Sequence, residues 1–154
     1  MNFWSNFKAL PGIYFFLLKC ISRQKNFLRK EFEEKLEVFK NSNDGSLKPS
    51  DFNKIYSYYG LGVPAILGEA FAVLRGKPLQ DKERSCLTYL GGISGLLDDF
   101  FDDPGKEADH LEKFVLTPED LIPNSTAEQL LLDFYWAGLK FSPHPELLKK
   151  QAMK

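Results

Sequence analysis

The residues best suited to chemistry are four acidic side chains that stand close together in the chain: Asp98, Asp99, Asp102 and Asp103. Because an α-helix advances about 100° per residue, Asp98 and Asp102 share one face, and the other two form a parallel pair beside them. Like charges at this spacing cost roughly 0.2–0.5 kcal/mol per pair. The macrodipole at a helix C-terminus adds roughly 0.3–1 kcal/mol for each carboxylate.

No Lys or Arg occurs between Ser85 and Gly105 to offset these charges. A hard cation with oxygen ligands is therefore expected to neutralise them, and Mg²⁺ commonly combines one or two carboxylates with waters and phosphate oxygens. The alternative is a solvated helix end that leads into the turn at Asp103-Pro104-Gly105.

The helix that must position these aspartates is apolar on most of its faces. Its leucine, isoleucine and phenylalanine side chains keep helical spacing upstream of Asp98, which predicts a central helix in a bundle. Three glycines, Gly91, Gly92 and Gly95, interrupt it, each at a cost of roughly 1 kcal/mol relative to alanine. Either close helix packing or room for a ligand beneath the metal would explain them, and both can hold together.

The pattern Asp98-Asp99-x-x-Asp102 resembles the first aspartate-rich motif of class I isoprenoid synthases, a group that includes prenyl diphosphate, squalene, phytoene and terpene synthases. The glycine-rich approach from Gly92 and the upstream run over residues 62–78 extend the likeness to about residues 60–103. The resemblance implies an all-α, antiparallel helical bundle of the isoprenoid synthase type, of which this chain would form the N-terminal half.

The resemblance also implies a chemistry and a set of site residues. Several Mg²⁺ ions would grip a prenyl diphosphate and assist its ionisation, as in a transferase or lyase. Asp98 and Asp102 would be the principal ligands, Asp99 a further ligand or an orienting group, and Asp103 an auxiliary. Other positions would contact the substrate: Ile93, Ser94 and Gly95 just before the motif, and Arg75 and Lys77 on the diphosphate. The sequence singles out no catalytic residue.

The chain departs from this family in two ways. No second metal-binding motif follows Asp103, and the length of 154 residues is about half that of a complete synthase bundle. Two accounts stay open: the N-terminal half of a synthase, inactive alone, or a half-length binding protein that pairs into a homodimer. The competing function is a noncatalytic helical module that binds a partner protein and carries an acidic, metal-binding helix end.

Composition narrows the remaining classes. The chain has the length of a single all-α domain over residues 1–154, and its net charge of -1 argues against a nucleic-acid partner. Two cysteines and two histidines are too few for a disulfide scaffold or a zinc cluster. The longest apolar run, residues 13–18, is far shorter than the roughly 20 residues of a transmembrane helix. A cytoplasmic protein is expected, and basic residues around that run leave a peripheral membrane contact open.

Helix signals fill the chain, whereas sustained period-two alternation is absent. We expect helices over residues 12–22 and 25–40, one from a cap at Ser50 through Tyr59, and a break over residues 60–63. A further helix should start with Pro64 and end before Gly76. Next come the aspartate-bearing helix over residues 81–103, a helix start at residues 117–120, a helix capped by Ser125 through residue 139, and a last helix after Pro145.

Overall fold

The computed structural model describes the backbone of residues 3–101 and 117–152 and the side chains of residues 11–97 and 117–149. Within these ranges the chain forms helices, turns and loops and no strand, which confirms the all-α expectation. Asp102 and Asp103 lie outside the described residues, and so do the side chains of Asp98 and Asp99.

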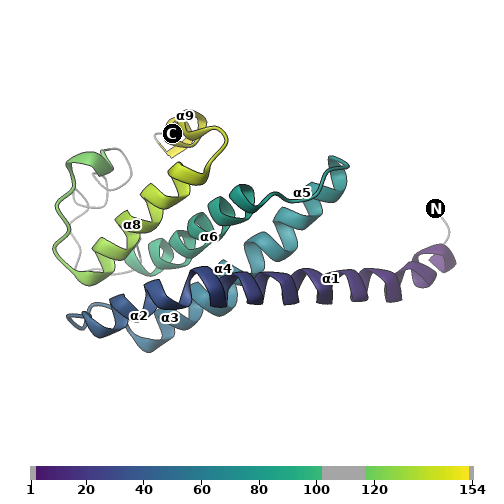
Figure 1. Cartoon of the computed structure of the whole chain (residues 1–154), viewed down its shortest axis with the longest axis horizontal. Coiled ribbons are helices and arrows are strands. Elements are labelled where there is room, and N and C mark those ends of the chain that lie inside the picture. The colour runs from purple at the N-terminus through teal and green to yellow at the C-terminus, as the bar shows by residue number, and fades with distance from the viewer. Residues whose placement is uncertain (1–2, 102–116, 153–154) are drawn as a thin grey trace.

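Helix α1 (Phe3–Glu31) is the longest element, and its N-terminal part projects beyond the rest of the molecule (Figure 1). The expected interruption near residue 23 is wrong, because Arg23 and Gln24 continue the helix as good helix formers. The chain bends instead at Phe32, which precedes α2 (Glu33–Asn41). Phe32 is fully buried, so the bend itself is anchored in the core.

A second long helix covers residues 49–74, although the sequence predicts a break in its middle. It comprises α3 (Pro49–Asn53), a π-helical turn η1 (Lys54–Tyr59), α4 (Gly60–Gly62), a second π turn η2 (Val63–Gly68) and α5 (Glu69–Leu74). Its N-cap is Lys48 rather than Ser50.

Pro64 is accommodated inside this helix by a partner from α1. A proline has no N–H to donate to the carbonyl four residues earlier, here that of Gly60. The side-chain amide of Gln24 donates to this carbonyl instead, at 2.7 Å. The expectation that Pro64 begins a new helix is therefore wrong, because a neighbouring helix replaces the missing hydrogen bond.

The end of this helix follows the sequence. Gly76 has a φ of 68°, the left-handed conformation that glycine adopts at low cost. The amides of Gly76 and Lys77 donate to the carbonyls of Val73 and Ala72 at 3.1 Å, which is the paired hydrogen-bond pattern of a Schellman motif.

The second half of the chain adds α6 (Asp81–Phe101), a 3₁₀ turn η3 (Pro118–Asp120), α8 (Thr126–Phe141) and α9 (Pro145–Ala152). The predicted cap of α8 is confirmed, since the amide of Glu128 donates to the Ser125 hydroxyl at 3.3 Å. The Glu128 carboxylate in turn accepts from the amide of Asn124 at 2.7 Å.

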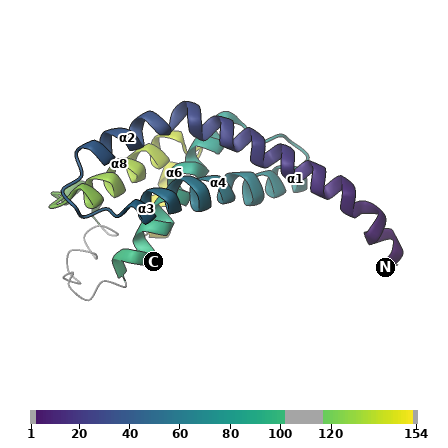
Figure 2. The ribbon, with the colours of Figure 1, turned by 90° about the horizontal axis from the view of Figure 1, so that it is seen from below.

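Helix α6 is the central element, as predicted. It packs against α8 on one side and against the helix over residues 49–74 on the other, and α1 runs beside the latter (Figures 1 and 2). The rings of Phe32, Tyr89 and Phe134 meet in the core with centroids 4.6–5.3 Å apart. The aspartate-bearing end of α6 thus belongs to a helix that packs against neighbours on both sides in the described part of the chain.

Candidate functional site

The candidate metal centre lies at the C-terminal end of α6. The backbone of Asp98 and Asp99 belongs to the last turn of this helix as far as the structure describes it, so both residues are helical as predicted. Among the described residues, no group of three or more His, Cys, Asp or Glu side chains is placed to hold a metal ion. The four predicted ligands are not covered by this finding, because their side chains are not described.

The glycines upstream of the aspartates are sites of close helix contact. A Cβ at Gly91 would lie 2.7 Å from the backbone oxygen of Tyr59, and a Cβ at Gly92 would lie 2.8 Å from the ring of Phe134. A Cβ at Gly95 would overlap the Tyr59 ring. The packing explanation of the glycines is confirmed. The space beside them is filled by these two aromatic rings.

Ile93 and Ser94, the remaining predicted substrate positions on α6, differ in their exposure to solvent. Ile93 is buried in the core cluster, on the face of α6 that packs inward. Ser94 is exposed, and its hydroxyl donates to the carbonyl of Gly91 at 2.7 Å. Of the positions just before the motif, Ser94 is therefore the one open to solvent.

Arg75 and Lys77 lie at the opposite end of α6 from the aspartates. The Arg75 guanidinium forms a two-pronged ion pair with Glu83, in the first turn of α6, and donates to the carbonyl of Pro78 at 3.1 Å. Since Asp98 follows Glu83 by fifteen residues, the two ends are about 22 Å apart at 1.5 Å per residue. The structure does not bring these two basic residues to the aspartates.

A buried polar network joins three helices, and the sequence-based predictions did not include it. The Arg84 guanidinium donates to Glu69 Oε1 at 2.6 Å and to Gln24 Oε1 at 2.9 Å. Gln24 Nε2 donates to Thr88 Oγ1 at 3.0 Å as well as to the Gly60 carbonyl, and Arg23 adds a second cation to Glu69 at 3.0 Å. Glu69, Arg84, Gln24 and Thr88 are each no more than 5% exposed.

Two signals in the sequence could have revealed this network. Glu69 is the only charged residue between Lys54 and Arg75, and a lone charge in an apolar helix is expected to be paired. Gln24 shares the inward stripe of α1 with Cys20 and Leu28, both of which are buried. Burial raises the pKa of the Cys20 thiol above its usual value, with a further contribution from the Glu69 carboxylate. The thiol is therefore a neutral core group.

A separate pocket of about 540 Å³ opens between α2 and the start of the helix over residues 49–74. Leu36, Leu47 and Phe52 line it with apolar side chains, and Lys40 and Glu33 line it with charged ones. The ammonium of Lys40 lies 5.9 Å from the centroid of the Phe52 ring. None of the predicted site residues with described side chains lines this pocket.

A scan against protein-family models found no match, and searches of curated proteins and of solved structures found no similar chain. The all-α fold is therefore assigned from the helices of the structure itself.

Proposed function

We propose that the C-terminal end of α6 binds Mg²⁺ through its aspartates and, through the metal, the diphosphate group of a prenyl diphosphate. The observation that carries the proposal is the set of four carboxylates, Asp98, Asp99, Asp102 and Asp103, without a Lys or Arg from Ser85 to Gly105. The central packing of α6 supports it, because the helix that supplies these groups packs against neighbouring helices on two sides.

Carboxylate oxygens suit Mg²⁺, which keeps open positions for waters and phosphate oxygens. When bound, the metal supplies Lewis-acid stabilisation of negative charge on a departing diphosphate. The role of the chain itself is to present carboxylates at a fixed spacing. A transferase or lyase activity would belong to an assembly that completes the second half of such a metal site.

The packing of α6 bears on where the isoprenoid chain would lie. Tyr59 and Phe134 occupy the space beside Gly92 and Gly95. The proposal therefore assigns the diphosphate, rather than the hydrocarbon chain, to the α6 end. Of the three predicted substrate positions on α6, Ser94 is the one whose side chain is exposed to solvent.

The test is calorimetric titration of inorganic pyrophosphate and of geranyl diphosphate, with Mg²⁺ and with EDTA. We expect binding only with Mg²⁺, and at least tenfold weaker binding in Asp98→Asn, because a lost charged ligand costs roughly 1.5–3 kcal/mol. Asp81→Asn is the matched control, since Asp81 is exposed at the other end of the same helix. Equal binding in EDTA, or unchanged binding in Asp98→Asn, would refute the proposal.

The second candidate is a noncatalytic helical binding module, and a specific observation favours it. Large apolar side chains on α1 and α5, among them Phe15, Phe71 and Leu74, are 65–81% exposed. A helical protein with such a surface is expected to associate with a partner. This function predicts no response to Mg²⁺ and a molecular mass in solution that changes with concentration or with an added partner.

A further inference from the structure

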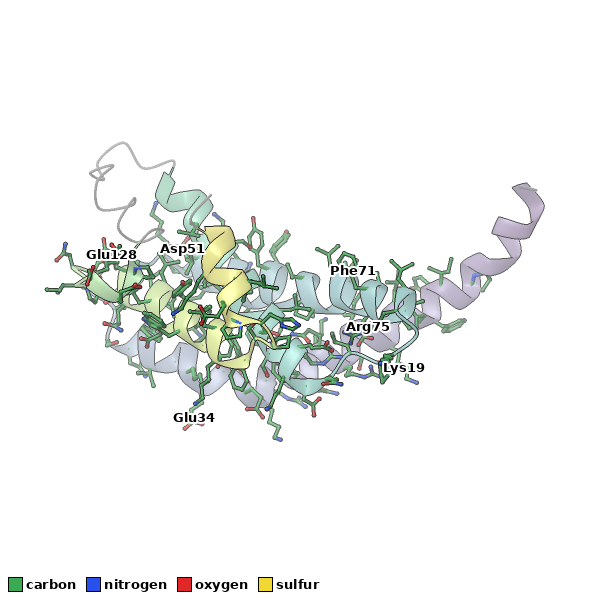
Figure 3. All side chains as sticks on the ribbon, turned by 90° about the horizontal axis from the view of Figure 1, so that it is seen from above. Lys19, Glu34, Asp51, Phe71, Arg75 and Glu128 are labelled. Atoms are coloured by element: carbon green, nitrogen blue, oxygen red, sulfur yellow. The ribbon has the colours of Figure 1, made fainter. Side chains whose placement is uncertain are left out.

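Two neighbouring helices leave apolar side chains uncovered at one end of the molecule. On α1 the exposed residues include Ile13, Phe15 and Leu18, and on η2 and α5 they include Ile66, Phe71 and Leu74. We refer to these six residues as the apolar face. In Figure 3, Phe71 lies on the outer edge of its helix, near the projecting part of α1.

The α5 end of the long helix has the reverse of the usual polarity of a surface helix. Its single charged residue, Glu69, points inward and is 5% exposed, paired with Arg84. Its outward positions are apolar, with Phe71 at 65% and Leu74 at 81% exposed. Surface helices normally turn their charges outward. This end is therefore built for an apolar environment on its outer side.

The projecting arm of α1 includes a stretch, residues 13–16, that is apolar on every side. Ile13, Tyr14, Phe15 and Phe16 occupy four successive positions about 100° apart, and each is at least 40% exposed. A helix that is apolar all round is expected to be buried in protein or in lipid. Figures 2 and 3 show this arm extending past α5 without covering from other described elements.

Charge distinguishes between the occupants that could cover this face. The first 30 residues contain six cations, Lys8, Lys19, Arg23, Lys25, Arg29 and Lys30, and no Asp or Glu. The remaining residues hold 14 basic and 21 acidic side chains, a net charge of -7. A second copy seated symmetrically on this face would bring two such basic segments together, which like-charge repulsion opposes.

A positive segment next to exposed aromatic and aliphatic side chains complements an anionic lipid surface. Amphipathic elements with this composition lie in the headgroup region, and each Lys or Arg near an anionic leaflet adds about 1 kcal/mol. In the described part of the chain, one helix, residues 49–74, is long and apolar enough by length and composition to cross a membrane, with 33% of its apolar window buried in the protein. The first half of this helix contributes Phe52 and Ile55 to the protein core, so only the outer side of the helix is available for contact with lipid.

We propose that the apolar face docks the protein peripherally onto an anionic phospholipid bilayer, with the α1 arm and the outer side of α5 in the headgroup region and the basic side chains on the lipid phosphates. This docking is independent of the aspartate site. It uses the opposite end of α6 and requires no Mg²⁺.

The test is co-sedimentation with vesicles of phosphatidylcholine alone and of phosphatidylcholine with 30% phosphatidylglycerol, in EDTA. We expect binding to the anionic vesicles that weakens with added salt. The double variant Phe71→Ser/Leu74→Ser should bind about tenfold more weakly, because two large side chains no longer enter the apolar layer. Lys19→Ala should bind about fivefold more weakly.

The matched controls make comparable changes, two exposed apolar residues to serine and one lysine to alanine, outside the apolar face. Val38→Ser/Ile122→Ser alters two side chains that are 62% and 79% exposed, on α2 and in the loop before α8, and Lys140→Ala removes an exposed cation from α8. Both should bind like the wild type, and so should Asp98→Asn. Equal binding to the two kinds of vesicle, equal loss in the control variants, or a stable dimer that no longer sediments with vesicles would each overturn the proposal.

Discussion

Glu69 is a buried carboxylate with two arginine partners, and its environment determines much of the stability at the junction of three helices. Arg84 is 3% exposed and also holds the side-chain oxygen of Gln24, whereas Arg23 is half exposed. A buried ion pair contributes little net stability relative to apolar residues, but removal of one partner leaves a buried charge. Arg84 is therefore the residue on which the network depends.

We predict that Arg84→Met lowers the free energy of unfolding by about 3–5 kcal/mol, because Glu69 and Gln24 both lose a buried donor. Urea denaturation followed by circular dichroism measures this loss. Arg29→Met is the control, since Arg29 is an exposed cation on the same helix as Gln24 and should change stability by less than about 0.5 kcal/mol. A loss in Arg84→Met no larger than that of the control would contradict the network's role.

The ion pair between Arg75 and Glu83 predicts a pH dependence. The hydrogen bonds from Arg75 lower the pKa of Glu83 from 4.5 to about 2. The unfolded chain thus takes up this proton at higher pH than the folded one. The stabilisation is complete above about pH 4.5 and is lost as the pH falls toward 2.

We expect Glu83→Gln to be about 0.5–1 kcal/mol less stable than the wild type at pH 7, the upper part of the range for a partly exposed pair. The difference should vanish near pH 2. Thermal denaturation of both proteins from pH 7 to pH 2 measures it. The lowered pKa of Asp44, also about 2, affects both proteins equally and cancels between them. A difference that stays constant over this range would show that Glu83 acts by packing alone.

At the scale of elements, glycines in helices have two distinct roles in this molecule. Gly91 lies against the backbone of the neighbouring helix, where a Cβ would be 2.7 Å from the Tyr59 oxygen. Gly62 lies inside the helix over residues 49–74, where a Cβ would meet no side chain and no neighbouring helix within 4 Å. The first glycine permits close packing, and the second only lowers helix propensity.

We predict opposite effects of the same substitution at these two sites. Gly91→Ala should destabilise the protein by about 1–3 kcal/mol, because the backbone of a packed helix must move. Gly62→Ala should stabilise it by about 0.5–1 kcal/mol through helix propensity and reduced freedom of the unfolded chain. Urea midpoints of the two variants test the pair, and shifts in the same direction would contradict the assignment of roles.

Local signals predicted some helix ends correctly and placed others wrongly inside continuous helices. Gly76 and Ser125 act as expected, because the unpaired backbone groups at a helix end form hydrogen bonds with residues close in the sequence. Pro64 misled the prediction, because the group that replaces its missing N–H comes from Gln24, 40 residues earlier. Such a partner is invisible to any local pattern.

At the scale of the whole molecule, helical periodicity predicted the all-α architecture and the central place of α6. The apolar spacing from Leu87 to Leu97 is a property of one helix, so it needs no knowledge of the partners. The exposed apolar side of α5 could not be predicted from periodicity. Apolar residues in a helix are normally expected in the core, whereas in the structure those of α5 are exposed.

For the candidate site too, local sequence patterns predicted some features and missed those that depend on tertiary contacts. Residue types and spacing were enough to propose a metal at Asp98, Asp99, Asp102 and Asp103. They were not enough to place Arg75, which a tertiary contact holds at the far end of α6. Proximity along the chain to a motif is therefore a weak guide to membership of its site when a full helix lies between them.

The two π turns of the helix over residues 49–74 have a consequence for how this chain tolerates length changes. Each π turn holds one residue more than the α-helical turn it replaces. Deleting a single residue between Lys54 and Tyr59 would therefore turn η1 into a regular α-helical turn and leave the following residues on their present faces. If these residues formed a regular α-helix at unchanged chain length, everything that follows would instead rotate by about 100°. Glu69 would then leave its arginines, and part of the outward apolar surface would turn inward. The π turn thus sets the direction in which the second half of the helix faces.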